Sequence, residues 1–124
     1  MGMNLISIFI GGGLGALLRY SVTIICRNIF LLPFVGTLIV NLIGCFLIGC
    51  LFGFLINKPN IIPITLRLFL SVGFLGGLTT FSTLDFEVFE LIKDGKILVG
   101  GLYFIGSCLA GLILTFVGYC LTCK

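Results

Sequence analysis

Two stripes of polar side chains interrupt otherwise apolar stretches of this sequence. The first stripe follows one face of a helix and consists of Thr37, Asn41, Gly44 and Cys45. The second repeats at every fourth residue and consists of Tyr103, Ser107, Gly111 and Thr115. A polar side chain deep in a membrane is a candidate functional residue, because burying it there is costly. A single polar contact between helices contributes only about 0.6 kcal/mol to stability. Two aligned stripes favour a lined passage, and polar contacts between helices are the alternative.

The donors on these stripes indicate which ion such a passage would carry. Asn41, Tyr103 and Ser107 can donate hydrogen bonds, and neither stripe holds a carboxylate that would attract a cation. Donors without a full positive charge suit an anion that must bind and then leave. The ring edge of Phe81 is electropositive and would add a second kind of contact, unless Phe81 serves only as apolar bulk facing lipid.

Residues 73–83 contain three glycines and four hydroxyl side chains in the middle of an apolar run. Glycine costs up to about 1 kcal/mol in a helix interior, and threonine is also a poor helix former. We therefore expect this segment to unwind, and its freed carbonyl groups would be able to hold a cation, as in the broken helices of transporters. A glycine-rich contact on an intact helix is the alternative.

The types of residue that are missing exclude several kinds of chemistry. The chain has no histidine, and its four acidic residues are Asp85, Glu87, Glu90 and Asp94. A Ser-His-Asp triad and a histidine-based metal site are therefore impossible within one chain, and we predict no enzyme activity. The six cysteines, which include one CxxC pair at Cys120 and Cys123, are interpreted as packing residues.

Composition identifies the elements that must position these side chains. Of 124 residues, 60% are apolar and 9% are charged, against about 25% charged in soluble domains. Because a helical span needs about 20 residues, we predict an all-α membrane protein with one domain over residues 1–124. Its four transmembrane helices would cover about 4–26, 34–56, 64–92 and 97–121. Arg27 and Asn28 mark the end of the first helix, and Pro33 and Pro63 begin the second and third.

The charged residues in the loops indicate how the chain inserts. The side that carries both termini holds Lys58, Arg67 and Lys124, and the other side holds Arg27, Lys93 and Lys96. Arg19 lies inside the first span, about seven residues or roughly 10 Å from its end. It either reaches the membrane surface or lends positive potential to a vestibule for anions. The two sides of the membrane thus carry nearly equal numbers of basic residues, which gives the positive-inside rule almost nothing to act on. This permits dual topology with an antiparallel dimer. A net charge of +3 over short loops does not indicate nucleic-acid binding.

Three motifs make the chain resemble a known family. Residues 11–20 read GGGLGALLRY, residues 36–44 read GTLIVNLIG, and residues 76–83 read GGLTTFST. In this order and with this spacing, the motifs resemble those of the Fluc fluoride channels, the family also called CrcB. The resemblance covers all four spans.

The resemblance implies a fold, a function and a set of site residues. It implies a fluoride-selective passive channel in the cell membrane, which exports fluoride from the cytoplasm as an antiparallel dimer with two pores. By motif position, the pore residues would be Asn41, Phe81, Ser82, Thr83, Glu87, Tyr103 and Ser107. A structural sodium ion at the dimer centre would be held by the backbone carbonyls of Gly76 and Thr79. Less specific candidates for the pore or vestibule are Arg19, Thr37, Leu84, Gly111 and Thr115.

One departure from the family pattern leaves a second interpretation open. The motif usually continues with a second phenylalanine, and here Leu84 takes that place. Gly111 likewise stands where a second hydroxyl residue often occurs. The alternative is a pore-completing subunit that pairs with an unlike paralogous subunit. A small multidrug or guanidinium exporter is a weaker rival, because such exporters need a buried carboxylate in the first helix and no acid precedes Asp85.

Overall fold

Four long apolar helices make up the molecule, as the sequence predicts. The structure is a computed structural model that describes residues 1–30, 32 and 34–123, without the side chain of Asn57. Pro33 and Lys124 lie outside the described residues. The helices able to cross a membrane are α1 (Gly2–Phe30), α2 (Phe34–Asn57), a third span over Ile64–Lys93, and α6 (Ile97–Thr122). The prediction of an all-α membrane protein with four spans is therefore confirmed.

The third span is built from several segments. It begins with α3 (Ile64–Leu68), continues through a π-helical stretch η1 (Phe69–Leu75), and adds one turn, α4 (Gly76–Leu78). After an interruption at Thr79 and Thr80 it resumes as α5 (Phe81–Lys93). Thr79 and Thr80 have extended backbones, with φ/ψ of −83°/152° and −150°/121°. The predicted break is therefore confirmed, and an intact third helix is excluded.

The break is shorter than the glycine-rich sequence predicts. Expected unwinding covers residues 73–83, whereas Gly73, Gly76 and Gly77 remain helical and only the two threonines leave the helix. The reason lies in packing, because Gly73 and Gly77 sit against the backbone of α1 around Gly11 and Gly12. Close contact between two backbones stabilises a helix that glycine alone would weaken.

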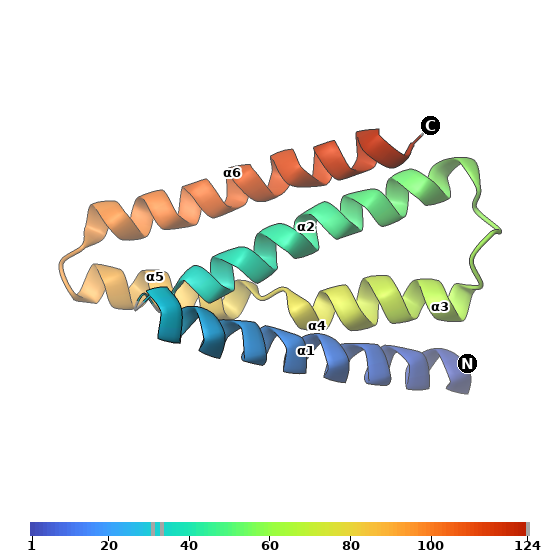
Figure 1. Cartoon of the computed structure of the whole chain (residues 1–124), viewed down its shortest axis with the longest axis horizontal. Helices are drawn as coiled ribbons and strands as arrows, with labels where there is room; N and C mark the ends of the chain where they lie inside the picture. Colours follow the sequence, from blue (N-terminus) through green and yellow to red (C-terminus); the bar gives the residue numbers. More distant parts are fainter. Residues whose placement is uncertain (31, 33, 124) are drawn as a thin grey trace.

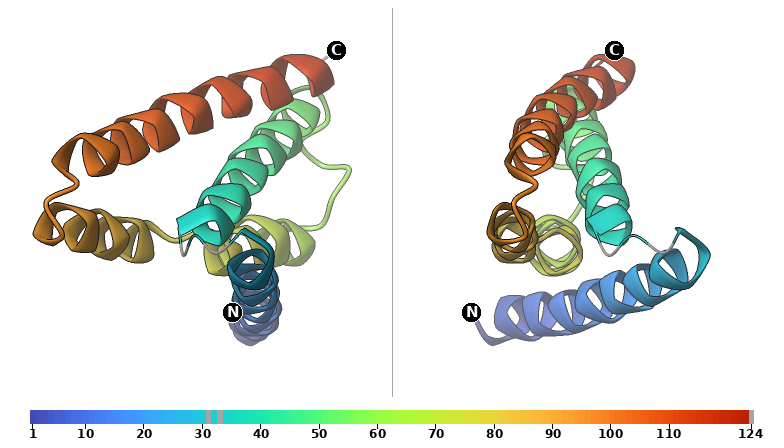
Figure 2. Two further views of the ribbon diagram at one scale, coloured as in Figure 1. Left: turned by 60° about the vertical axis from the view of Figure 1, so that its left-hand side comes forward. Right: turned by 90° about the vertical axis from the view of Figure 1, so that its left-hand side faces the viewer.

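The helices pack in pairs along their length. In Figure 1, α2 runs beside α6 and α1 runs beside the first half of the third span, and both termini lie at the same end of the bundle. The two views in Figure 2 place the third span between α1 on one side and α2 with α6 on the other. The break near the centre of the third span therefore faces residues from several helices. The first helix differs from prediction at its end, because α1 continues past Arg27 and Asn28 to Phe30.

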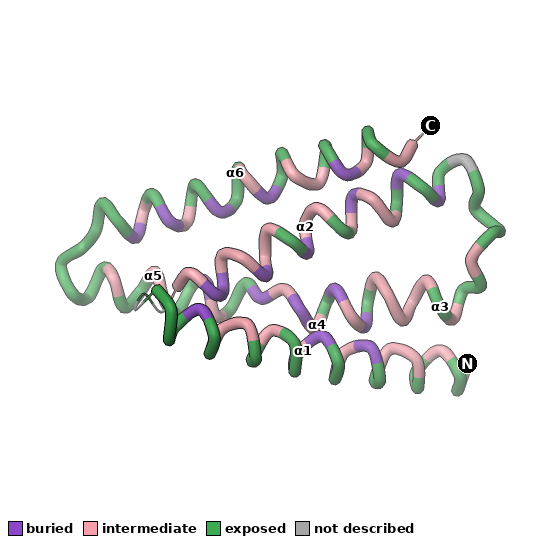
Figure 3. Tube along the Cα trace, viewed as in Figure 1, coloured by how far each residue is buried: buried purple, intermediate pink, exposed green. Residues whose placement is uncertain are grey.

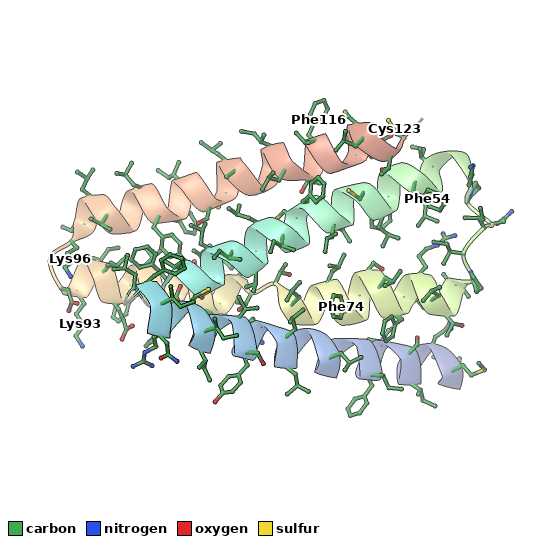
Figure 4. The ribbon with its side chains drawn as sticks, in the orientation of Figure 1. Phe54, Phe74, Lys93, Lys96, Phe116 and Cys123 are labelled. Atoms are coloured by element: carbon green, nitrogen blue, oxygen red, sulfur yellow. The ribbon has the colours of Figure 1, made fainter. Side chains whose placement is uncertain are left out.

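Burial is confined to the sides on which the helices face each other. Figure 3 shows buried residues along these inner sides and exposed residues along the outer ones. A small core forms where Val40 of α2 meets Leu75 and Leu78 of the third span. Large apolar side chains cover the outer surface, and Phe116 points away from the bundle in Figure 4 with 67% of its surface exposed. Such a surface is suited to lipid rather than to water.

Glycines permit the closest approach between helices. A Cβ atom at Gly15 of α1 would overlap the carbonyl oxygen of Phe74 and come within 2.8 Å of the amide nitrogen of Leu78. Gly49 and Gly118 play the same part where α2 meets α6, each against the backbone of the opposite helix. Gly15, Gly49 and Gly118 therefore serve close packing between helices of the same chain.

Replacing Gly15 with alanine tests this close approach. The added methyl group would force α1 away from the third span, and we expect the free energy of unfolding to fall by about 1–3 kcal/mol. Unfolding in detergent, followed by circular dichroism, measures the change. Gly13→Ala is the matched control, because no other helix among the described residues comes within 4 Å of a Cβ at Gly13. Equal stability of the two variants would contradict the packing described here.

Candidate functional site

The broken backbone of the third span is held by a side chain from α2. The amide group of Asn41 accepts a hydrogen bond from the Thr80 N–H, with 2.7 Å between Thr80 N and Asn41 Oδ1. The same amide donates to the Thr80 carbonyl, with 3.0 Å between Asn41 Nδ2 and Thr80 O. One side chain thus satisfies both backbone groups of Thr80. Unpaired backbone groups are very costly at membrane depth, so Asn41 stabilises the extended conformation.

Thr80 forms the N-cap of α5. Its Oγ1 atom accepts a hydrogen bond from the Thr83 N–H at 3.2 Å and donates to Thr83 Oγ1 at 3.0 Å. Ser82 Oγ lies 3.3 Å from the same hydroxyl. A threonine at this position satisfies one of the donors that a helix start leaves unpaired. The hydroxyl residues Ser82 and Thr83 therefore begin α5 just after the break.

A groove of about 490 Å³ lies beside the break, between the third span and the pair formed by α2 and α6. Its wall combines apolar side chains with a few polar groups, among them Asn41, Thr79 and Ser107. Gly76, Phe81, Leu84, Gly111 and Thr115 also line it. The structure therefore brings together residues from both polar stripes, the broken segment and the phenylalanine motif.

The stripe on α6 is divided between this groove and a second site. Ser107, Gly111 and Thr115 line the groove, whereas Tyr103 lies outside it. The Thr115 hydroxyl lies 3.0 Å from both the Cys45 and the Gly111 carbonyl oxygens, within donating distance of either. The Cys45 thiol occupies the space beside Gly111, since its sulfur would be 3.1 Å from a Cβ there. At Gly111, a thiol from α2 thus stands where the stripe lacks a side chain.

The second site joins three helices through Glu87. Thr37 Oγ1 donates to Glu87 Oε1, and the Tyr103 hydroxyl donates to Glu87 Oε2, both at 2.8 Å. The ring of Tyr103 also packs against Phe34 with 5.0 Å between ring centroids. Thr37 is almost fully buried, with 1% of its surface exposed. Thr37 and Tyr103 are therefore ligands of the carboxylate in this structure, rather than members of the groove wall.

Glu87 also borders a smaller hollow at one end of the bundle. This hollow, about 240 Å³ in volume, is lined by acidic and basic residues that include Glu90, Lys93, Asp94 and Lys96. Figure 4 shows Lys93 and Lys96 at the end of the bundle opposite to Cys123. The carboxylate of Glu87 thus lies where the third span meets this charged end of the bundle.

The remaining candidate residues differ in their exposure and in their position relative to the two hollows. Phe81 is 62% exposed and meets the ring of Phe104 edge-on, with 6.1 Å between centroids. Leu84, one turn further along α5, is only 4% exposed. Arg19 lies on α1 and borders neither hollow.

Sequence reasoning missed the roles of Thr80 and Cys45. Thr80 caps α5 and pairs with Asn41, whereas the sequence alone marks it only as one of several hydroxyl residues. A signal was present, because a threonine just before an amphipathic stretch is a helix N-cap pattern. No local signal places Cys45 beside Gly111, since that contact depends on how α2 packs against α6.

These features define a multi-pass membrane protein with a broken third span and a groove lined by hydrogen-bond donors. Residues 6–119 match the model of the CrcB-like protein family, described as Camphor Resistance (CrcB). The chain therefore belongs to the CrcB-like family.

Similar proteins carry a functional name. A protein of Aquifex aeolicus named "Fluoride-specific ion channel FluC" is 40% identical over 116 residues, which are 93% of each chain. Relatives with the same name occur in Geobacter sp., 44% identical over 93% of each chain, and in Pyrococcus horikoshii, 40% identical over 92% of this chain and 91% of its own. The family resemblance read from the three motifs is confirmed.

Removing the Tyr103 hydroxyl tests the contact with Glu87. A hydrogen bond to a charged group contributes about 1.5–3 kcal/mol, so Tyr103→Phe should lower the free energy of unfolding by about that amount. Tyr20→Phe is the control, because Tyr20 is 66% exposed on α1. Unfolding of both variants in the same detergent gives the comparison. A Tyr103→Phe variant as stable as Tyr20→Phe would show that the 2.8 Å contact contributes nothing.

Proposed function

We propose that this chain forms a passive channel for fluoride, which carries the ion out of the cytoplasm and lowers its toxicity. The observation that carries the proposal is the groove beside the break, lined by Asn41, Phe81 and Ser107. These residues offer an amide, a ring edge and a hydroxyl, and the described residues place no carboxylate in the groove wall. The names of the relatives point to the same ion.

The contacts of Asn41 and Ser107 suggest how they would treat an anion. An amide group has two N–H donors, and only one of those of Asn41 is needed for the Thr80 carbonyl. The second can meet an ion in the groove. The Ser107 hydroxyl donates to the Tyr103 carbonyl at 2.6 Å, and a hydroxyl can rotate toward a stronger acceptor. Both groups can thus replace part of a hydration shell while the break stays in place.

An antiparallel dimer of two copies is the assembly we propose. The groove lies on the side of one subunit, with Phe81 largely exposed, so a second copy would be needed to close it. Opposite insertion is compatible with the nearly equal charges at the two ends, Lys58 and Arg67 against Lys93 and Lys96. An unlike paralogous subunit in place of the second copy is the alternative, favoured by Leu84 at the position of a second phenylalanine.

A structural sodium ion between the two subunits belongs to this proposal. Gly76 and Thr79 line the groove at the break, and their carbonyl oxygens are hard ligands of the kind that replace the water shell of an alkali cation. The described residues contain no group of three or more histidine, cysteine or acidic residues near one another. Two subunits would supply four carbonyl oxygens, and a bound cation would neutralise these dipoles and link the copies.

Fluoride efflux from liposomes that contain the purified protein alone tests the function. Wild-type protein should release fluoride down its gradient, as a fluoride electrode measures. Asn41→Asp puts a negative charge in a low-dielectric groove, which is costly for an anion, so flux should collapse. Phe81→Ile keeps bulk without the electropositive ring edge and should reduce flux strongly. Full flux in Asn41→Asp would overturn the assignment of the groove as the pathway.

Leu84→Phe in the same assay separates the two assemblies. If a second ring at this position is dispensable, wild type conducts alone and the variant conducts about equally. We expect this result, because Asn41 and the hydroxyl groups already supply donors. A wild-type protein that barely conducts, together with a Leu84→Phe variant that conducts well, would instead favour a pore completed by an unlike subunit.

Labelling a single cysteine tests dual topology. In a background without the six native cysteines, one cysteine placed at the C-terminus should react with a membrane-impermeant reagent from both sides. A cysteine in the 93–96 turn, at the other end of the bundle, should give the same two-sided result. Reaction from one side only, opposite for the two positions, would rule out the antiparallel dimer of identical copies.

A further inference from the structure

Four carbonyl groups lose their normal helical partners at the break. In a continuous helix, the carbonyls of residues 76, 77, 78 and 79 would accept from the N–H groups of residues 80, 81, 82 and 83. The extended backbones of Thr79 and Thr80 prevent this pattern. Such carbonyls remain available to a ligand only while something keeps the helix from closing, since closing would pair them again.

For two of these four carbonyls, the N–H group that would be the helical partner donates instead to a side-chain oxygen. We call each such contact a capture. The Thr80 N–H, which would pair with the Gly76 carbonyl, donates instead to Asn41 Oδ1 at 2.7 Å. The Thr83 N–H, which would pair with the Thr79 carbonyl, donates instead to Thr80 Oγ1 at 3.2 Å. The two captures act on different donors and come from different elements, α2 and the break itself.

We propose that Asn41 and Thr80 are positioning residues that keep the Gly76 and Thr79 carbonyls free for the cation. This inference rests on the sodium site of the proposed function, and it adds which side chains create that site. Asn41 uses its oxygen for this task and one N–H to hold the Thr80 carbonyl at 3.0 Å. The same amide that would meet fluoride therefore also shapes the cation site.

Contacts around the break also favour the extended conformation of Thr79 and Thr80. Gly44 of α2 lies one turn after Asn41, and a Cβ there would overlap the Thr79 side chain. The Thr79 hydroxyl donates to the Leu75 carbonyl at 2.9 Å, so it is directed back along α4 and away from Thr83. Thr80 is 8% exposed, which shields its captured groups. These contacts hold both threonines extended.

Substitutions at Asn41 separate its two tasks. Asn41→Leu removes the oxygen that captures the Thr80 N–H, so the Gly76 carbonyl can recover its helical partner. Asn41→Asp retains an oxygen acceptor for that N–H and loses the donors. We therefore expect Asn41→Leu to lose both sodium binding and fluoride flux, whereas Asn41→Asp loses flux and keeps sodium binding.

Substitutions at Thr80 test the second capture. Thr80→Val removes the hydroxyl that accepts from Thr83, and Thr80→Ser retains it. Sodium binding should weaken in the first variant and survive in the second. Thr122→Val is a matched control, because Thr122 donates to the Cys50 carbonyl at 2.8 Å, at the far end of α2 and α6. Asn4→Leu serves the same purpose for Asn41, since Asn4 joins α1 to α3 through Thr65.

The experiment measures the thermal stability of purified dimer in detergent as sodium replaces N-methylglucamine at constant ionic strength. A ligand that binds only the native state raises the unfolding temperature with concentration. The sodium concentration that gives half of this rise should increase about tenfold or more in Asn41→Leu and Thr80→Val. It should stay unchanged in Thr80→Ser and both controls, and it should not rise in Asn41→Asp. An unchanged sodium response in Asn41→Leu and Thr80→Val would overturn the proposal.

Nuclear magnetic resonance of the backbone tests the roles of Asn41 and Thr80 separately from the proposed sodium site. The Cα and Cβ chemical shifts of Thr79 and Thr80 report whether each residue is extended or helical. Helical shifts in Asn41→Leu would support the capture of the Thr80 N–H, even if wild-type protein showed no sodium response. In that case the cation site would be wrong and the role of Asn41 in opening the helix would stand. Extended shifts that persist in both Asn41→Leu and Thr80→Val would refute the capture itself.

Discussion

The pairing between the Asn41 amide and the Thr80 backbone is the interaction on which the rest of this structure depends. A membrane-embedded helix tolerates an interruption only where its backbone groups find partners. Asn41 provides both partners from one side chain, at 2.7 and 3.0 Å. Without this pair, we expect the third span to close into a continuous helix, and the groove would lose the part of its wall formed by Thr79 and Thr80.

The consequences of this pairing extend along α5. Because the helix restarts at Phe81, the ring of Phe81 faces outward beside the break while Leu84 turns inward. One further turn along α5 places Glu87 between Thr37 and Tyr103. The break therefore sets the register of α5, and this register separates the groove from the charged end of the bundle.

Glycine residues allow the helices around the break to pack closely against one another. Gly15 and Gly77 bring α1 against the third span, and Gly49 and Gly118 bring α2 against α6. Close backbone contact compensates for the weak helix propensity of glycine, so the glycine-rich stretch before Thr79 remains helical. The result is a closely packed frame around two extended residues, Thr79 and Thr80.

The sequence by itself determined that the helices lie in a membrane, how many spans there are, and the family. Apolar runs of this length have few possible structures other than membrane-spanning helices, and the three motifs are specific. It also located the break, since glycines and threonines weaken a helix wherever they occur. Only the tertiary structure decided that the break is two residues long, that Tyr103 and Thr37 bind Glu87, and that Cys45 fills the space at Gly111. The physical reason is that hydrogen-bond partners and close contacts join residues far apart in the chain, as Asn41 and Thr80 are. Local propensity and periodicity carry no information about which distant residue will meet them.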